Sequence, residues 1–298
     1  MFWLTNRESD TVMKKSLKLA VLGSPIAHSR SPQLQTSFAD DCGISDFSYE
    51  RIETTRETLL STVRRLIAQG YDGFNCTMPL KTDMALLSDY LGDEARVLCS
   101  ANTVAVKDGK LHADTTDGIG ILLTVRRGFG DMNIPYTNAV NGKRVLLLGA
   151  GGAARSAALS LKNAGAQLTL ANRTVGGAVA LRTMLGIDCE CLPLGNVDAL
   201  SQASGECDIL INCNALGMSG NPEFETLSFI DTMKSGALVI DAVYNPLETT
   251  LLKYAAARGL NAVSGLWMLV YQGAVAFEKW SGVLPDEDAC LRAFELIK

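Results

Sequence analysis

The stretch that decides the fold is "KRVLLLGAGGAARSAALSLKNAGAQLTLANRT", residues 143–174. An apolar run of strand length leads through a Gly-rich turn into an Ala-rich helical segment and then a second apolar run. The turn reads G-x-G-x-x-A, with small residues at Gly149, Gly151 and Ala154. Small residues there permit a tight turn, the approach of a pyrophosphate to backbone N–H groups, and close packing of helix on strand. The stretch predicts a dinucleotide-binding unit; the alternative is a purely structural turn.

The end of the second strand bears on which dinucleotide is bound. An NAD-specific site would present Asp or Glu to the ribose hydroxyls, but this chain has Asn172-Arg173-Thr174. An arginine there can pair with a 2′-phosphate, which favours NADP. The alternative is a solvated surface arginine, because exposed arginines are common. No second cation follows in "VGG", residues 175–177, which leaves room for NAD.

Outward from this unit, strand-like and helix-like runs alternate along the chain. Strands are expected at 17–23, 46–52, 73–77, 208–212 and 237–241, a hairpin at 102–113 with its turn at Asp108-Gly109, and helices at 32–42, 55–69, 117–127 and 266–296. The irregular polar stretch at 128–143 separates two well-patterned regions. The alternation predicts an α/β fold with parallel strands and crossover helices.

Length and composition limit the classes of protein. The chain has 298 residues, of which 47% are hydrophobic and 20% charged, typical of a globular protein with two domains. Its net charge is −5, and no run of Lys or Arg forms an arm, which argues against nucleic-acid or acidic-membrane partners. No apolar run has the length of a membrane helix. The first dozen residues are expected to be a loose extension, with Met13 as an alternative start.

The cysteines indicate a reducing compartment. There are eight, without a CxxC pair, and the closest spacing is Cys189-x-Cys191, which lacks the spaced partners of a zinc site. We expect reduced thiols, no metal, and a cytoplasmic protein. The order of charged and apolar residues at the N-terminus is also the reverse of a secretory signal.

A pair of serines suggests an anion site. In "GSPIAHSRSPQLQ", residues 23–35, Ser29 and Ser31 are two positions apart after a strand-like run. Residues i and i+2 of an extended segment point the same way, so both hydroxyls can reach one small polar group. Pro32 suits the first position of a helix with Ser31 as its cap, and a helix start attracts anions. We expect these serines to bind a carboxylate.

Hydride transfer to a dinucleotide requires a group that handles the substrate's proton. The two histidines, His28 and His112, are as well explained by structural roles. Lys81 ends "GFNCTMPLK", although a lysine in a loop is usually a surface cation. Asp117 and Asn102 lie in "HADTTDG" and "SANTV"; alone, the first would be a helix cap and the second a turn residue.

The motifs taken together resemble one family. "GSPIAHSRSP", "NCTMPLK", "ANTV", "DTTDGIG", "GAGGAAR", "ANRT", "VYNPLETTLL" and "GLWMLVYQGAVAFEKWSG" occur in the order and spacing of the shikimate/quinate dehydrogenases. The resemblance runs from about residue 18 to residue 282 and covers both halves of the chain. It implies an open N-terminal α/β substrate domain completed by C-terminal helices, residues 1–117 and 266–298, and an inserted Rossmann-type domain, residues 118–265.

The same resemblance implies an activity and a set of site residues. The activity is the NADPH-dependent, reversible reduction of 3-dehydroshikimate to shikimate in chorismate and aromatic amino-acid biosynthesis, by a monomer or homodimer. Lys81 is implied as proton donor and acceptor beside Asp117. The substrate contacts are implied to be Ser29, Ser31, Thr77, Asn102, Asp117, Tyr244 and Gln272. The cofactor contacts are implied to be Gly149, Ala150, Gly151, Gly152, Ala153, Asn172, Arg173, Thr174, Asp93, Ala242, Gly265 and Met268.

The chain departs from the family pattern at a few positions. The family commonly has G-D-N-T-D at residues 113–117, L-G-M-L at 266–269 and T-P-L-L at 249–252. Asn214 stands where Thr or Ser is usual, and Trp267 is a large replacement near the expected nicotinamide pocket. Two alternatives remain: a quinate/shikimate dehydrogenase that uses NAD(H), and a non-catalytic sensor of nucleotide and acid. A sensor needs no proton shuttle, so the presence of Lys81 with Asp117 counts against it.

Overall fold

The computed structural model describes residues 16–298, and the predicted loose extension, with Met13, lies outside this range. The chain forms two compact units. We call residues 118–269 the inserted unit, and residues 16–117 with 270–298 the split unit, because the chain leaves the latter and returns to it. The domain boundaries inferred from the sequence stay a prediction.

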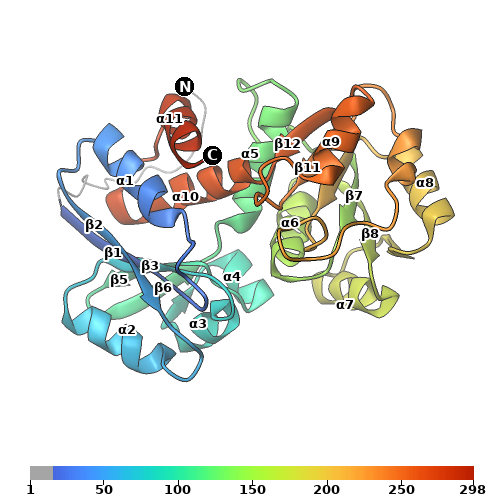
Figure 1. Ribbon diagram of the computed structural model, residues 1–298. Helices are drawn as coiled ribbons and strands as arrows, with labels where there is room; N and C mark the ends of the chain where they lie inside the picture. Colours follow the sequence, from blue (N-terminus) through green and yellow to red (C-terminus); the bar gives the residue numbers. More distant parts are fainter. Residues whose placement is uncertain (1–15) are drawn as a thin grey trace. The chain divides into compact units, whose positions relative to one another are not determined.

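The split unit is built on a mixed sheet of six strands in the order β2-β1-β3-β5-β6-β4 (Figure 1). The strands are β1 (Ser16–Gly23), β2 (Asp46–Glu53), β3 (Gly73–Cys76), β4 (Tyr90–Leu91), β5 (Thr103–Lys107) and β6 (Lys110–Asp114). Strand β1 runs parallel to β2 and β3, whereas β5 is antiparallel to β3 and β6. Asp108 and Gly109 both have positive φ, as the predicted two-residue hairpin turn requires.

Helices cover both faces of this sheet. They are α1 (Ser31–Asp41), α2 (Leu59–Ala68), α3 (Lys81–Leu87), α4 (Asp93–Leu98), the larger part of α10 (Leu266–Ser281), and α11 (Glu287–Ile297). Leu66 of α2 and Met84 of α3 pack with Phe74 of β3 in one apolar core. On the opposite side, α1 lies beside α10 (Figure 1). The two helices meet through Phe38 and Phe277, whose ring centroids are 5.9 Å apart.

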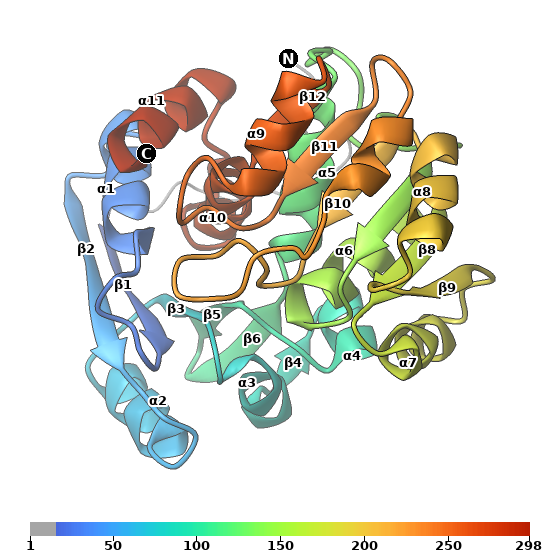
Figure 2. The same cartoon turned by 45° about the vertical axis from the view of Figure 1, so that its right-hand side comes forward.

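The inserted unit contains a parallel six-stranded sheet in the order β12-β11-β10-β7-β8-β9. The strands are β7 (Arg144–Leu148), β8 (Gln167–Asn172), β9 (Glu190–Pro193), β10 (Ile209–Asn212), β11 (Leu238–Asp241) and β12 (Asn261–Ser264). The helices are α5 (Asp117–Gly128), α6 (Gly152–Asn163), α7 (Val175–Leu185), α8 (Val197–Glu206), the 3₁₀ helix η1 (Ser228–Thr232) and α9 (Thr250–Ala257), seen in Figure 2. Numbered from β7, this is the 3-2-1-4-5-6 order of a Rossmann fold, which confirms the predicted fold class.

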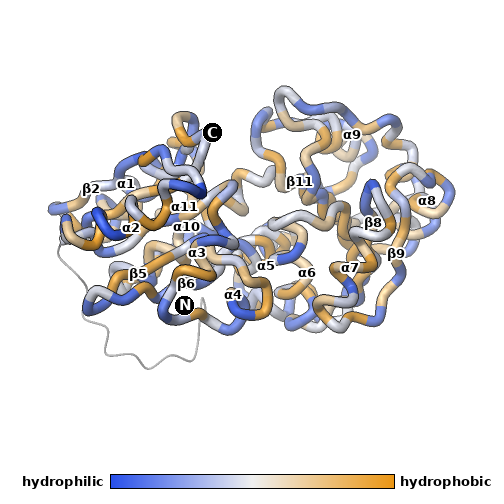
Figure 3. Tube along the Cα trace, turned by 90° about the horizontal axis from the view of Figure 1, so that it is seen from below, coloured by the Kyte–Doolittle hydropathy of each residue, from blue (hydrophilic) through white to orange (hydrophobic). Residues whose placement is uncertain are grey.

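Hydrophobic burial holds each unit together. Apolar stretches run through the interior of each unit, and polar ones lie mainly at the periphery (Figure 3). Strand β7 has four consecutive buried residues, as expected for a parallel strand covered on both faces. No helix within residues 16–298 is long and apolar enough to cross a membrane.

Some local expectations were wrong. The helix expected from Thr55 begins at Leu59, because residues 55–58 form a turn in which the Thr58 hydroxyl accepts from Thr55 N at 3.0 Å. The C-terminal helical tail is two helices, α10 and α11. Ser31 is not a helix cap: it lies inside α1, and its backbone N–H donates to Ser29 Oγ at 3.3 Å. Strands β4, β9 and β12 were not predicted.

Candidate active site

The centre of the site in the split unit is an ion pair. Lys81 is the first residue of α3, and Asp117 is the first residue of α5. Lys81 Nζ lies 2.6 Å from Asp117 Oδ2, and the two side chains are 27% and 10% exposed. Removing a carboxylate from water is costly unless it is paired, and Lys81 is the partner of Asp117 here. The structure thus brings together the two residues that were inferred to carry the proton chemistry.

A buried amide connects this pair to the rest of the cluster. Asn102 Nδ2 lies 2.9 Å from Asp117 Oδ1 and 3.1 Å from Gln272 Oε1. Asn102 Oδ1 accepts from the backbone N–H of Thr116 at 2.9 Å, and Thr116 Oγ1 lies 3.3 Å from Gln272 Oε1. We call Lys81, Asn102, Thr116, Asp117 and Gln272 the polar cluster. Thr116 was missed by sequence reasoning, although its place next to Asp117 was a usable signal.

Hydrogen bonds connect three further residues to Asn102, directly or through one another. Sequence reasoning also missed these residues. Asn75 Nδ2 donates to the backbone carbonyl of Asn102 at 2.9 Å and lies 3.1 Å from Thr103 Oγ1. The Tyr49 hydroxyl donates to Asn75 Oδ1 at 2.6 Å. Burial raises the pKa of Tyr49 well above its usual value, so the phenol keeps its proton and remains a donor. The chain of hydrogen bonds continues to the hydroxyl of Ser31.

The predicted serine pair and Thr77 lie at the ends of neighbouring strands. Ser29 lies between β1 and α1, Ser31 is the first residue of α1, and both are half-buried. The guanidinium of Arg51 donates to the Ser29 carbonyl at 2.8 Å and fixes the backbone there. Thr77 follows β3, and its N–H donates to Leu22 O at 2.9 Å. The carboxyl ends of parallel strands are where open α/β sheets bind ligands, so the position of these hydroxyls is consistent with a binding role.

The Gly-rich turn of the inserted unit has room for a phosphate. Gly149 has φ +121°, a conformation that strongly favours glycine, and its Cβ position would be 3.0 Å from the Cys213 carbonyl. Gly151 and Gly152 are exposed, and an added Cβ at either would meet no atom within 4 Å. Ala154 is fully buried where α6 packs on the sheet. The open space at the start of α6 is consistent with the predicted pyrophosphate site.

A cavity of about 610 Å³ lies beside the carboxyl ends of β8 and β10. Its lining residues include Asn172, Arg173, Thr174, Asn214, Glu223 and Glu225. The backbone N–H of Leu216 donates to Asn214 Oδ1 at 2.8 Å, whereas Asn214 Nδ2 is buried with no hydrogen-bond partner among the described residues. An unpartnered buried donor indicates a missing acceptor, such as an oxygen of a nucleotide. We call this cavity the nucleotide cavity.

The remaining predicted contacts lie on other segments. In the inserted unit, Ala242 and Tyr244 follow β11, and an added Cβ at Gly265 would be 2.3 Å from the Ala242 carbonyl, so only glycine fits. Met268 is buried in α10. Asp93 belongs to the split unit, where its exposed carboxylate pairs with Arg96 at 3.4 Å.

The large residue at position 267 has a defined contact. Trp267 is buried, and the Arg127 guanidinium lies 3.4 Å from its ring centroid. Such a cation–π contact holds the indole against the last turn of α5. Trp267, which departs from the family pattern, therefore packs against its own unit, the inserted unit.

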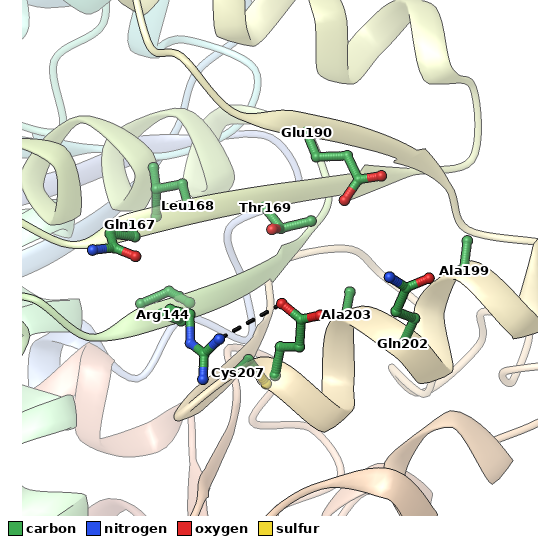
Figure 4. A pocket seen from close by; sticks show the side chains of 11 residues that line it. Arg144, Gln167, Leu168, Thr169, Glu190, Ala199, Gln202, Ala203 and Cys207 are labelled. Atoms are coloured by element: carbon green, nitrogen blue, oxygen red, sulfur yellow. Dashed lines mark ion pairs between the residues drawn. The ribbon is translucent and has the colours of Figure 1, made fainter.

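A second cavity, of about 230 Å³, lies at the opposite edge of the same sheet (Figure 4). Arg144, Gln167 and Glu190 begin β7, β8 and β9 and line it together with α8. Arg144 Nη1 is 3.6 Å from Glu206 Oε2, a weak surface ion pair. Within residues 16–298, no cluster of His, Cys, Asp and Glu side chains could hold a metal ion, and all eight cysteines are free thiols.

Comparisons with known proteins agree with this geometry. Family models match the shikimate dehydrogenase substrate binding domain over residues 21–104, shikimate/quinate 5-dehydrogenase over 134–235, and the shikimate 5′-dehydrogenase C-terminal domain over 265–293. The chain is 38% identical over 283 residues to the shikimate dehydrogenase (NADP(+)) of Roseobacter denitrificans, covering 94% of this chain and 98% of the relative.

Solved structures show the same likeness. Shikimate 5-dehydrogenase from Thermus thermophilus, in complex with NADP(H) and shikimate, has TM-score 0.79 and 32% identity over 95% of this chain and all of that one. The 5-ketofructose reductase of a Gluconobacter species has TM-score 0.81 and 28% identity over 95% of this chain and 99% of that one. From the family models and from relatives that match nearly its whole length, this chain belongs to the shikimate dehydrogenase family.

Proposed function

We propose that this protein is a shikimate dehydrogenase that reversibly reduces the ring ketone of 3-dehydroshikimate with NADPH. The observation that carries the proposal is the largely buried Lys81–Asp117 pair, in a chain that also has a Gly-rich dinucleotide turn after β7 and Arg173 directly after β8. The family membership supports the substrate class, and the NADP-dependent relatives support the cofactor.

The bound NADPH would supply the hydride to the carbonyl carbon. The residues that would hold it are the Gly-rich turn from Gly149 to Ala153, the segment from Asn172 to Thr174, and Asp93, Ala242, Gly265 and Met268. The guanidinium of Arg173 is the cation proposed to pair with the 2′-phosphate. The amide of Asn214 adds a donor in the wall of the nucleotide cavity.

Lys81 is proposed to move the proton. Its ammonium donates a proton to the carbonyl oxygen during reduction, and the amine so formed takes the proton back from the hydroxyl during oxidation. Asp117 accepts a hydrogen bond from the ammonium and so fixes the direction of its remaining N–H bonds. Asn102 holds the other oxygen of the carboxylate, which keeps the pair in one orientation. Such positioning before the substrate arrives lowers the cost of reaching the transition state.

Each polar group of the substrate is paired with protein side chains of matching chemistry. The hydroxyls of Ser29 and Ser31 are proposed to bind the substrate carboxylate from the end of β1. Thr77, Asn102, Asp117, Tyr244 and Gln272 are proposed to hold the ring hydroxyls and carboxylate. The partner is thus a small polyhydroxylated acid.

A spectrophotometric assay tests the proposal. Shikimate and quinate are each combined with NADP and with NAD, and the absorbance of reduced nicotinamide is followed. We expect turnover with shikimate and NADP to exceed the other three combinations. A preference for quinate with NAD would replace the proposed substrate and cofactor. Binding of both ligands without turnover would instead show a sensor.

A further inference from the structure

A buried carboxylate in the inserted unit has no part in the proposed chemistry. Asp241 ends β11, and it is fully buried. Its Oδ1 accepts from Asn212 Nδ2 at 2.8 Å and from the backbone N–H of Val243 at 3.1 Å. Its Oδ2 accepts from the hydroxyl of Thr249 at 2.6 Å. All three donors are uncharged. The Asp241 carboxylate is therefore held by neutral hydrogen-bond donors and not by an ion pair.

The bonding pattern identifies the form of the acid that fits this place. Thr249 Oγ1 already accepts from Leu252 N at 3.3 Å, so its own proton is directed at Asp241. An ionised carboxylate can accept all three hydrogen bonds. A protonated carboxyl group has an O–H donor of its own, and the three neighbouring groups are donors and offer it no acceptor. Burial raises the pKa of Asp241, the carboxylate of Glu223 adds to that rise, and the three hydrogen bonds oppose it.

The first segment held by this carboxylate lines the nucleotide cavity. Asn212 donates to Asp241 with its amide, and Asn212 Oδ1 accepts from the backbone N–H of Asn214 at 3.1 Å. Asn214 in turn accepts from Leu216 N with its own carbonyl oxygen. Asn214 Nδ2 is left buried with no hydrogen-bond partner among the described residues. The orientation of that donor in the cavity wall therefore depends, through one intermediate, on Asp241.

The second segment is the loop from residue 242 to residue 249. Asp241 binds the loop near its start, at Val243 N, and at its end, through Thr249, which caps α9. Between the two anchors lies Tyr244, which is assigned above to the substrate. Ala242 is confined by its close approach to Gly265. One carboxylate thus holds both ends of the loop that carries Tyr244.

We propose that Asp241 is a positioning residue that sets the nucleotide-facing segment 213–216 and the Tyr244 loop at the same time. This inference rests on the proposed function, because both segments matter only if nucleotide and acid bind there. Asp241 touches neither ligand in this account. It acts through Asn212, Val243 and Thr249.

Two variants and two controls test the role. Asp241→Asn replaces one acceptor oxygen by an N–H₂ group of the same size, and Thr249→Val removes one donor without changing the shape of the side chain. Thr249→Ser keeps the hydroxyl and is the conservative rescue. Thr124→Val is the matched control, because Thr124 is also fully buried in the inserted unit and donates a 2.7 Å hydrogen bond, to Gly120 O in α5.

The measurements are the Kd for NADPH by fluorescence titration and the KM for shikimate and kcat by turnover. We expect Asp241→Asn and Thr249→Val to raise both the Kd and the KM about 10-fold, with a change in kcat below about threefold, since each loses a buried hydrogen bond of the carboxylate that links the two segments. Thr249→Ser should restore both constants to nearly wild-type values. A purely structural role would lower the melting temperature of each valine variant and leave the constants of the folded enzyme unchanged.

The outcomes separate this inference from the proposed function. If the folded Thr249→Val enzyme has a Kd and a KM within about twofold of those of Thr124→Val, Asp241 does not position these segments, and the proposal is wrong. Should Asp241→Asn fail to fold, Thr249→Val decides alone. If wild-type enzyme shows no turnover of shikimate, the proposed function fails, and the NADPH titration still tests the effect on segment 213–216.

Discussion

The polar cluster of the split unit and the nucleotide cavity of the inserted unit satisfy their polar groups in opposite ways. In the cluster, Lys81, Asp117 and Asn102 bond to one another within the protein. In the cavity, the exposed Arg173 has no ion pair among the described residues, and Asn214 Nδ2 has no acceptor there. Groups assigned to proton transfer are held by the chain itself, whereas groups assigned to the nucleotide depend on the ligand for their partners.

This difference has a physical origin. A proton-transfer group must be correctly placed before the substrate arrives, because reorganisation during the reaction adds to the barrier. A dinucleotide brings many acceptor oxygens of its own, so its site needs donors and space. Glu223 and Glu225 also line the cavity, so its lining carries two negative charges beside the positive charge of Arg173.

The largest expected effect comes from removing the charge at the centre of the cluster. Lys81→Met should lower kcat about 100-fold to 10,000-fold, the usual contribution of a proton-transfer group, and leave the Kd for NADPH nearly unchanged. Steady-state turnover and NADPH fluorescence measure the two quantities. Lys110→Met is the control, since Lys110 forms a 3.0 Å ion pair with Asp89 in the same unit but on the surface. Near-normal turnover in Lys81→Met would remove this lysine from the role.

The next effect tests whether the cluster is held as a network. Asn102→Ala leaves Asp117 Oδ1 and the N–H of Thr116 without their partner. We expect kcat/KM for shikimate to fall about 100-fold and the free energy of unfolding to fall by about 2 to 3 kcal/mol, because buried polar groups lose their bonds. Urea unfolding and turnover check both values. Asn196→Ala, which removes only the cap of α8, should cost about 1 kcal/mol without a kinetic effect.

A smaller effect is expected in the open cavity. Arg173→Ala should raise the KM for NADPH about 10-fold and change that for NADH little, since it removes one charge-assisted contact and leaves two carboxylates facing the phosphate. The ratio of the two constants is the measurement. Arg144→Ala, at the cavity on the other edge of the same sheet, should leave both constants unchanged. Equal effects of the two variants would mean that Arg173 acts only through net charge.

The smallest effect concerns a place where the inserted unit resembles the cluster, the buried Asp241. Because burial raises the pKa of Asp241, the folded protein binds this proton more tightly than the unfolded chain does, and the contribution to stability falls as pH rises. The free energy of unfolding of wild type minus that of Asp241→Asn should therefore decrease from about pH 4 upward. Urea titrations at several pH values measure it. A difference that grows with pH would show that the carboxylate is stabilised in its charged form.

Much of the fold could be predicted because the decisive signals are local. The turn around Gly149 and the run of strands and helices after it identify the Rossmann-type sheet, and the hairpin turn at Asp108-Gly109 was correct. Strands β4, β9 and β12 are short or largely exposed and carry too little apolar pattern to be seen. The pairing of Lys81 with Asp117 came from the family motifs rather than from spacing, and the structure brings the two together.

The contacts of the supporting residues could not be predicted, because their partners are remote in the sequence. Tyr49 meets Asn75, which is 26 positions away, and Thr116 meets Gln272, which is 156 positions away. Their roles depend on which strands become neighbours and on how α10 returns to the split unit. The error at Ser31 has a local cause: the Ser29 side chain takes the backbone N–H of Ser31, and α1 already includes that residue.

The return of the chain to the split unit at residue 270 has a consequence for synthesis on the ribosome. Phe38 of α1 packs against Phe277, and α1 also packs against α11, so one face of the first sheet stays partly uncovered until the last helices are made. At roughly 5 to 20 residues per second, translating the inserted unit takes on the order of 10 to 30 s. Residues 118–269 can therefore fold as a complete unit while the split unit still lacks residues 270–298. A nascent chain stalled once Leu269 has emerged from the ribosome should therefore resist protease in its inserted unit and be cleaved in residues 16–117.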